Sequence, residues 1–259
     1  MRRLITVMAM SLCFISARAE QAENTMLNLL VPSGLEQGQA YFNIGHKYFY
    51  NLLDYKSPDE DVFAPITAGA NINIGFRYMI WNGIEAGLHY NGAGQEKRVS
   101  LSWSTAFEMA AVSVYSEFFS YRESGGAYAN NLFALVSGQS MKFFDVLSFT
   151  LNLGYDGYNE KPVAGAGASA TFMEKYSVMA EFYPVFKDGT GGYCFGFKAV
   201  TYGHQFVFFA GNTAGQGPRN TMLSGSRFNS AAVSTKLRSF GSQFALMVTK
   251  SSGFKTPLG

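Results

Sequence analysis

The three histidines of this 259-residue chain are its best candidates for acid–base or metal chemistry, because imidazole titrates near neutral pH. His46, His89 and His204 show no metal-ligand spacing such as His-Glu-x-x-His. His46 falls among apolar residues, His204 falls at a short turn, and His89 falls on a polar face. A lipid hydrolase would need a serine and a histidine paired on its lipid-facing side, and no such pair is recognisable. We therefore expect no catalytic, cofactor-binding or metal-binding residues and no enzymatic activity.

Two further motifs have ordinary structural interpretations. Gly165-Ala-Gly167 could suggest a nucleotide-binding loop, but no helical pattern follows it, and such loops hold phosphate at a helix N-terminus. We interpret these glycines as small residues that leave space in a lumen or between strands. Asp145, Asp156 and Asp188 stand alone near predicted turns, where acidic residues are common, and they form no calcium loop.

Eight ionisable residues fall on the polar faces of predicted strands, which would line the lumen of a barrel. They are Lys47, Arg77, Glu85, His89, Arg98, Glu117, Glu181 and Lys198. Adjacent strands would bring Arg77 near Glu85, or Arg98 near Glu117. Charges at bilayer depth must pair or meet water. They either line a water-filled pore and set its selectivity or pair across a filled lumen. The sequence leaves both open, and we place the filled lumen first.

The segments that carry these charges have the two-residue period of β-strands. In residues 69–80 every even-numbered residue is apolar, whereas the odd-numbered ones are mostly polar or small. Successive strand side chains point to opposite faces, so such a strand has one apolar and one polar face. Residues 84–90 repeat the alternation after Asn82-Gly83, and two alternating runs joined by Asn-Gly predict a hairpin.

About 12 segments alternate in this way, and we predict a strand in each. A tilted membrane strand needs roughly 9–11 residues. Short and longer connections alternate, as in bacterial barrels with short periplasmic turns and longer outer loops. The chain would then enter from the periplasm. The predicted strands are 39–50, 69–80, 84–90, 98–105, 108–121, 131–142, 147–155, 162–172, 176–182, 193–201, 204–213 and 240–250.

The last strand requires a choice, because residues 227–237 could form a thirteenth strand and bacterial barrels have an even count. We take 240–250 as the closing strand. Ser239, Gly241, Phe244 and Leu246 resemble the assembly signal of outer-membrane barrels, although five residues follow Phe254. No segment is typical of a long amphipathic helix.

Composition argues against a soluble β protein. Aromatic residues make up 16% and charged residues 15% of the chain, whereas soluble domains carry about 25% charged residues. A soluble barrel would expose Lys, Glu and Asp on its polar faces, but here those faces are mostly Ser, Asn, Gly and Thr. Aromatics near strand ends suit membrane interfaces. These are Tyr48, Tyr50, Tyr78, Trp81, Tyr90, Tyr155 and Tyr193.

The first residues are typical of a secretory signal peptide. Arg2 and Arg3 precede an uncharged stretch over 4–16, and Ala17-Arg18-Ala19 provides a small-residue cleavage site. We therefore predict four regions. They are a signal peptide (1–19), a periplasmic N-terminal segment (20–38), a β-barrel (39–250) and a C-terminal tail (251–259).

Cleavage changes the charge and cysteine counts. The mature chain would keep 17 basic and 18 acidic residues, a net charge of −1. This leaves no basic stripe for a nucleic acid. Cys194 would be the remaining cysteine, so an intramolecular disulfide is excluded.

Two stretches carry a family resemblance. Val31-Pro-Ser-Gly-Leu and Gly38-Gln-Ala-Tyr-Phe-Asn-Ile-Gly-His46-Lys-Tyr-Phe resemble the opening strand of a Bacteroidetes outer-membrane β-barrel family of unknown function. The stretch Phe206-Val-Phe-Phe-Ala-Gly-Asn-Thr-Ala-Gly215-Gln-Gly is similar to that family's penultimate strand and loop. The resemblance implies a fold and a location. It implies no activity, so no catalytic residue is carried over.

We therefore expect an all-β, antiparallel up-and-down transmembrane β-barrel in the bacterial outer membrane. Its function would be that of a structural or accessory envelope component or a small-solute channel. One alternative is a surface ligand-binding protein that uses residues 51–68 and 214–239, and another is a membrane-embedded lipid-modifying enzyme. The expected partners are outer-membrane lipid and lipopolysaccharide, the barrel-assembly machinery and small solutes. We expect no nucleic acid and no cofactor.

Overall fold

The computed structural model describes residues 25–48, 71–92, 95–122, 126–140, 143–144, 146–173, 175–184, 191–201, 204–213, 218–227 and 239–248. The expected signal peptide, the connection 51–68 and the C-terminal tail lie outside these ranges. Of residues 227–237, the described part is Arg227, which ends a helix.

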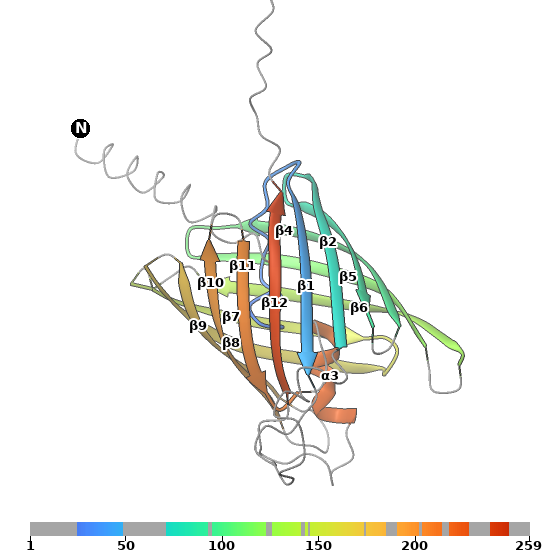
Figure 1. Cartoon of the computed structure of the whole chain (residues 1–259). Coiled ribbons are helices and arrows are strands. Elements are labelled where there is room, and N and C mark those ends of the chain that lie inside the picture. Colours follow the sequence, from blue (N-terminus) through green and yellow to red (C-terminus); the bar gives the residue numbers. More distant parts are fainter. Residues whose placement is uncertain are drawn as a thin grey trace, which may run out of the picture.

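Twelve strands and one helix make up the described elements (Figure 1). Each strand coincides with a predicted segment to within a few residues. The helix α3 was not predicted. The strands are β1 (Ala40–Tyr48), β2 (Asn71–Trp81), β3 (Ile84–Asn91), β4 (Glu96–Ala106), β5 (Ala110–Arg122), β6 (Tyr128–Ser140), β7 (Leu147–Asp156), β8 (Lys161–Phe172), β9 (Tyr176–Tyr183), β10 (Gly192–Thr201), β11 (His204–Gly211) and β12 (Ser239–Val248), and α3 spans Pro218–Arg227.

The strands form a closed, antiparallel, up-and-down barrel. Each strand pairs with its neighbours in sequence, and β1 also pairs with β12, which closes the sheet. Ala40 on β1 lies opposite Tyr78 on β2 and opposite Val248 on β12. Closure removes the free strand edges that would otherwise pair with other chains. The prediction that 240–250 forms the closing strand is confirmed.

The alternation of the sequence becomes an inside and an outside. In β4 the burial alternates strictly over its first eight residues. Arg98, Ser100 and Ser102 are buried inside, whereas Val99 and Leu101 are more than half exposed outside. A soluble barrel would bury its apolar face, so this orientation is typical of a barrel surrounded by lipid. Among the predicted interface aromatics whose side chains are described, Tyr78, Trp81, Tyr90 and Tyr155 are exposed and Tyr193 is half-buried.

The two ends of the barrel differ in their connections. At the turn end, strands are joined by short connections such as 82–83, 107–109 and 173–175. At the loop end, the connections include residues 49–70 and 212–238. The helix α3 belongs to the second of these and lies at the loop end, low in Figure 1. Within the described residues, no helix is long and apolar enough to cross a membrane.

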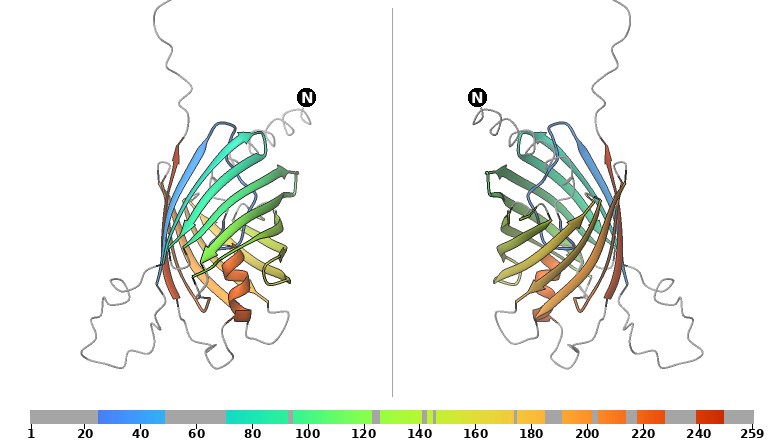
Figure 2. Two further views of the ribbon diagram at one scale, coloured as in Figure 1. Left: turned by 90° about the vertical axis from the view of Figure 1, so that its right-hand side faces the viewer. Right: turned by 90° about the vertical axis from the view of Figure 1, so that its left-hand side faces the viewer.

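The N-terminal segment corrects one prediction. Residues 20–38 were expected in the periplasm, but the stretch Thr25–Leu35 runs inside the barrel, where α3 also lies (Figure 2). Leu27, Leu29 and Leu30 are at most 2% exposed. The physical reason is the hydrophobic effect: this leucine-rich run buries apolar area inside the barrel that would otherwise face water. We call residues Thr25–Leu35 the plug segment.

Candidate functional site: the filled lumen

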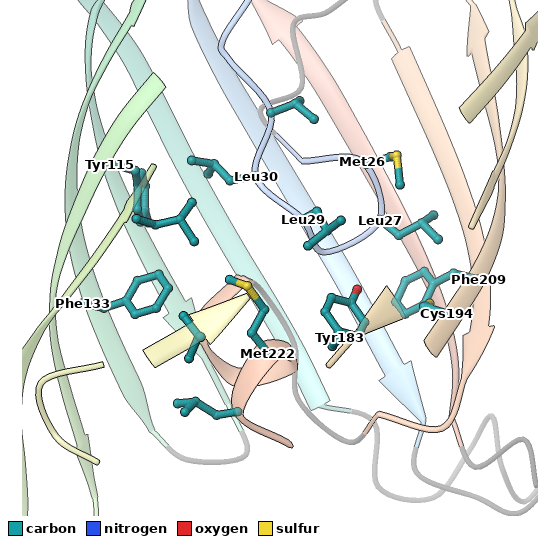
Figure 3. Packing of buried hydrophobic residues seen from close by; sticks show 14 of the residues in the cluster. Met26, Leu27, Leu29, Leu30, Tyr115, Phe133, Tyr183, Cys194, Phe209 and Met222 are labelled. Carbon is teal, nitrogen blue, oxygen red and sulfur yellow. The ribbon is translucent and has the colours of Figure 1, made fainter. Parts of the chain in front are cut away.

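One side of the lumen is filled by apolar side chains. The plug segment contributes Met26, Leu27, Leu29, Leu30 and Val31 to a single buried cluster. The wall and α3 supply the rest (Figure 3). The wall residues are Tyr115, Phe119, Phe133, Leu135, Val163, Met179, Tyr183, Cys194, Val207 and Phe209, and α3 adds Met222 and Leu223.

Glycines of the wall leave the space into which the plug segment fits. A Cβ atom at Gly165 on β8 would lie 2.3 Å from Leu29 Cδ2, and one at Gly196 on β10 would lie 2.3 Å from Leu27 Cδ2. At Gly167 the same atom would lie 2.2 Å from Met26 Cε. These distances are below van der Waals contact, so even alanine would require the plug side chains to move. The interpretation of Gly165 and Gly167 as lumen space is confirmed.

A buried carboxylate on β9 holds the turn of the plug segment. Glu181 Oε1 accepts hydrogen bonds from the backbone N–H groups of Leu27, Asn28 and Leu29 at 2.7, 3.0 and 2.9 Å. Its other oxygen accepts from the Asn28 side chain and from the hydroxyl of Tyr183. Bonds to an ionised acceptor are the strong ones, and consecutive N–H groups in a turn form an anion-binding concavity. Glu181 therefore satisfies three donors that would otherwise be buried without partners.

Leu30 has a second set of polar contacts with the wall. Its N–H donates to Asn152 Oδ1 at 2.7 Å, and its carbonyl accepts from Asn152 Nδ2 at 2.8 Å and from Ser137 Oγ at 2.6 Å. The side-chain amide of Asn152 thus both accepts from and donates to the backbone of Leu30, as the backbone of a neighbouring strand would. Both Asn152 and Ser137 are fully buried. The plug segment is therefore bonded to β6, β7 and β9.

An ion pair near the turn end also touches the plug segment. Arg77 Nη1 lies 2.8 Å from Glu85 Oε2, and both side chains are almost fully buried. The same Glu85 oxygen accepts a hydrogen bond from Ser33 Oγ at 2.7 Å. The guanidinium of Arg77 also lies over the ring of Tyr41, 4.4 Å from its centre. The predicted proximity of Arg77 and Glu85 is confirmed.

A second ion pair joins β4 and β5. Arg98 Nη1 lies 3.6 Å from Glu117 Oε2, and Arg98 Nη2 donates to Asn73 Oδ1 at 2.8 Å. The hydroxyl of Tyr115 donates to the same Glu117 oxygen. The predicted proximity of Arg98 and Glu117 is confirmed, and their burial agrees with the filled lumen rather than with an open, water-lined pore.

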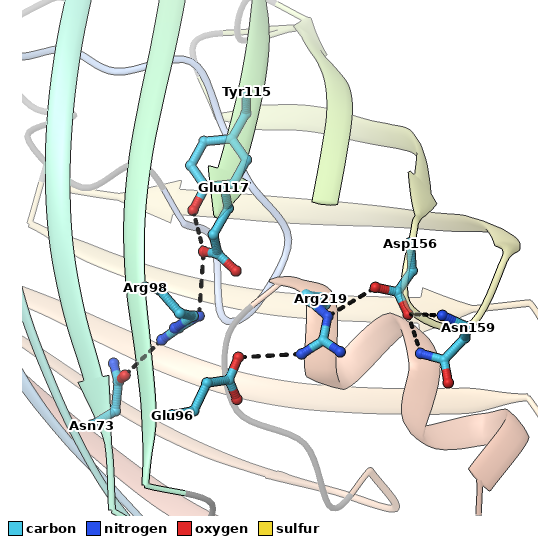
Figure 4. Close-up of polar contacts among 8 residues, drawn as sticks. All are labelled: Asn73, Glu96, Arg98, Tyr115, Glu117, Asp156, Asn159 and Arg219. Atoms are coloured by element: carbon cyan, nitrogen blue, oxygen red, sulfur yellow. Dashed lines mark hydrogen bonds and ion pairs between the residues drawn. The ribbon is translucent and has the colours of Figure 1, made fainter. Parts of the chain in front are cut away.

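The third charged group is centred on Arg219 of α3 (Figure 4). Its Nε donates to Asp156 Oδ1 at 2.9 Å and its Nη1 to Glu96 Oε1 at 3.2 Å. Its guanidinium carbon lies 3.4 Å from the ring centre of Phe119. Asp156 does accept a hydrogen bond from the backbone N–H of Asn159 in the following turn, but it is fully buried and paired with Arg219, so the expectation that it stands alone is wrong. Its position at the end of a strand resembles a solvated turn in sequence, and Arg219, its partner, lies 63 residues away.

The remaining predicted lumen residues have different surroundings. His89 is half-buried on the inner face, near Gly75 and Gly87. Lys198 is half-buried at an inward register position. The side chain of Lys47 lies outside the described part of the structure. Among the described residues, no group of three or more His, Cys, Asp or Glu could hold a metal ion.

The other histidines are separated from His89. His46 alternates with the buried Tyr41 and Gly45 of β1 and so occupies an outward position. His204 begins β11, where it pairs with Thr201. The sequence argument missed α3, Arg219 and the lumen position of the plug segment. The apolar run from Met26 to Val31, unusual for a periplasmic linker, was the available signal.

No family model and no curated protein sequence matches the chain. Several solved structures are similar to it. A KdgM porin is similar with a TM-score of 0.52 and 11% identity, covering 81% of this chain and 99% of the porin. A KdgM porin in complex with disordered oligogalacturonate gives a TM-score of 0.50 and 9% identity, covering 82% and 99%. The outer membrane phospholipase A from Escherichia coli gives 0.46 and 10%, covering 85% and 95%. The chain has the fold of outer-membrane β-barrel proteins.

Proposed function

We propose that this protein is an integral outer-membrane β-barrel whose lumen is closed by its own chain. It acts as a structural or accessory component of the envelope rather than as a permanently open pore. One observation carries this proposal. Glu181, on the wall, binds three consecutive N–H groups of the plug segment, and the side chains around that turn fit against Gly165, Gly167 and Gly196.

The outer surface supports a membrane location. Large apolar side chains cover the outward positions, including Phe76, Leu88, Leu151 and Phe195, each more than 40% exposed. Exposed apolar area of this extent would be unfavourable in water, whereas lipid tails would cover it. The expected partners are therefore outer-membrane lipid and lipopolysaccharide, together with the barrel-assembly machinery.

The closed lumen argues for a non-enzymatic role. The buried ionisable residues pair with one another, as Arg77 does with Glu85, or bind backbone groups, as Glu181 does. We infer that Arg77, Glu85 and Glu181, engaged in this way, stabilise the fold rather than act on a substrate. We extend this to cofactors and propose that the protein works without one.

Single-channel recording in planar bilayers tests the proposal. Purified wild-type protein should give no stable conductance steps, while its circular dichroism remains that of a β-barrel. A variant that lacks residues 25–33 serves as the control, because removing the plug segment should leave an opening and produce ohmic steps. Stable steps of similar size from the wild-type protein would contradict a closed resting state.

A small-solute channel is the second candidate. It is favoured by the way the plug segment is attached, since its described contacts with the wall are non-covalent. The fold also resembles that of the KdgM porins, one of which is described in complex with disordered oligogalacturonate. In this case the wild-type protein would open when a ligand or a membrane potential displaces the plug segment. Rare steps that become frequent in the presence of a solute would favour this candidate.

A further inference from the structure

The surroundings of Arg219 form a complete site on the barrel wall. The two carboxylates come from Glu96, the first residue of β4, and Asp156, the last residue of β7. The aromatic face comes from Phe119 on β5. Arg219 is the member that belongs to α3. We call Glu96, Phe119 and Asp156, with the flanking Tyr121 and Tyr158, the cation cage.

Four members of the cage, Phe119, Tyr121, Asp156 and Tyr158, have contacts other than those with Arg219. The backbone N–H of Asn159 donates to Asp156 Oδ2 at 3.2 Å, and its side-chain amide donates to the same oxygen. The rings of Tyr121 and Tyr158 are in edge-to-face contact, with centres 5.2 Å apart. Phe119 stacks on Tyr121 at 6.3 Å between ring centres. A site whose members support one another can keep its shape when its occupant changes.

The charges make an empty cage unfavourable. Glu96 is 5% exposed and Asp156 is fully buried, and two buried carboxylates without a cation carry a large desolvation penalty. Glu117 is also buried nearby, and its Oε1 has no hydrogen-bond partner in the described structure. In Figure 4 the Glu117 carboxylate lies on the Arg219 side of Arg98. If α3 moves away, the two carboxylates must be hydrated, take up protons or bind another cation in the place of Arg219.

The geometry selects a guanidinium rather than a compact cation. Arg219 donates from two different nitrogens to two carboxylates, while its guanidinium carbon lies 3.4 Å from the Phe119 ring centre. A guanidinium has several donors in one plane and stacks on aromatic rings, whereas an ammonium is a strongly hydrated point charge. Tyr121 and Tyr158 are half-buried at the loop end, so the cage is near the rim from which an external ligand would approach.

We propose that the cation cage is a recognition site for the guanidinium group of an external ligand, an arginine-bearing peptide. Arg219 is the chain's own occupant of that site. The ligand competes with Arg219 and releases α3 from the wall. The release of α3 rests on the proposed closed lumen, but binding at the cage does not. The two can therefore be tested separately.

The first test uses Arg219→Ala, which empties the cage, in detergent. Millimolar methylguanidinium should raise the thermal midpoint of this variant, whereas the same concentration of methylammonium should not. Adding Asp156→Asn to Arg219→Ala should abolish the rescue. Arg122→Ala, at an exposed position at the loop end of β5, is the matched control and should show no guanidinium-specific shift. Equal shifts of the thermal midpoint of Arg219→Ala by methylguanidinium and methylammonium would overturn the proposal.

The second test measures peptide binding directly. A fluorescent arginine-containing peptide should bind Arg219→Ala at least about tenfold more tightly than its lysine counterpart, the ratio that corresponds to about 1.4 kcal/mol. Loss of heat-modifiable migration on a gel would show that Arg219→Ala fails to fold. In that case Arg219→Lys is used instead, because lysine keeps the positive charge but lacks the planar guanidinium that stacks on Phe119. Equal affinity for the two peptides would contradict a guanidinium site.

The third test asks whether the ligand reaches the wild-type protein. Saturating arginine peptide should increase hydrogen exchange in α3, and the lysine peptide should not. If the peptide binds Arg219→Ala but does not change hydrogen exchange in α3 of the wild-type protein, the cage serves only to hold α3. That result would overturn the proposal of an external ligand. Neither exchange nor peptide binding depends on conductance, so failure here is distinguishable from failure of the closed-barrel proposal.

Discussion

The backbone N–H of Asn28 lies 3.0 Å from each of the two carboxylate oxygens of Glu181, a residue 153 positions later in the chain. This bifurcated contact joins the segment before the first strand to the ninth strand of the barrel. It is buried, since Asn28 is 1% and Glu181 is 3% exposed. This contact fixes a turn of backbone inside the barrel, and it supports the closed lumen that we propose.

Replacing Glu181 with glutamine should loosen the plug segment. An amide has one acceptor oxygen, and its NH₂ group would face N–H donors, so buried donors lose their partners at a cost of about 1–3 kcal/mol. Hydrogen exchange of peptides that cover residues 25–31 should become faster. Glu108→Gln, at an exposed position in the turn between β4 and β5, is the control and should leave the exchange unchanged. Equal protection in both variants would mean that the carboxylate does not hold the turn.

Filling the space at Gly165 should displace the plug segment. A leucine there would overlap Leu29, because even a Cβ atom lies 2.3 Å from Leu29 Cδ2. We expect Gly165→Leu to give conductance steps in planar bilayers and to make the N-terminal segment sensitive to added protease. Ala166→Leu adds the same side chain at an exposed, outward position on the same strand, and it should remain silent and resistant. The same conductance and the same protease sensitivity in both variants would contradict the contact between Gly165 and Leu29.

Breaking the Arg77–Glu85 ion pair should destabilise the barrel. Both side chains are at most 3% exposed, and removing one partner of a buried pair costs about 3–5 kcal/mol because the other charge is left uncompensated. Urea unfolding in lipid vesicles measures the free energy for Arg77→Ala, Glu85→Ala and the double variant. The double variant should be more stable than the sum of the single losses predicts, by about 0.5–3 kcal/mol of coupling. Additive losses would indicate that the two side chains act independently.

The two tryptophans report the membrane position of the turn end. Trp81 is 66% and Trp103 is 50% exposed on the outer face, and both lie opposite Ile84 in the sheet. In Trp103→Phe the emission of Trp81 should be quenched by lipids brominated near the headgroup and protected from aqueous iodide. The reverse variant, Trp81→Phe, reports Trp103 in the same way. Efficient iodide quenching with no quenching by lipid would place this rim in water.

Much of the barrel could be predicted from local patterns. The alternation in residues 69–80 and 84–90 predicted β2, β3 and the turn between them, because a strand's period is visible in its own residues. The same reasoning paired Arg77 with Glu85 and Arg98 with Glu117, since neighbouring antiparallel strands bring such positions together. These two pairs of charged wall residues were therefore recognisable without coordinates, whereas the wall carboxylates Glu96 and Asp156, which bind Arg219, were not.

The contents of the lumen were not predictable in this way. Residues 20–38 were assigned to the periplasm, and Asp156 to an ordinary turn, because their partners are distant in the sequence. Leu29 lies against Gly165, and Asp156 binds Arg219. The helix α3 also escaped prediction. It is short and contains a proline and a glycine, and helices of this length depend on tertiary packing for their stability.

The sequence by itself therefore determined the wall: the strand period, the inward and outward faces and the pairs of charges on adjacent strands. Only the tertiary structure decided that this lumen is filled. Closing the sheet brings β8, β9 and β10 around one space, where their glycines and Glu181 meet a run of apolar residues from the start of the chain. Strand alternation is a local property, whereas packing inside a barrel depends on which distant residues share its interior.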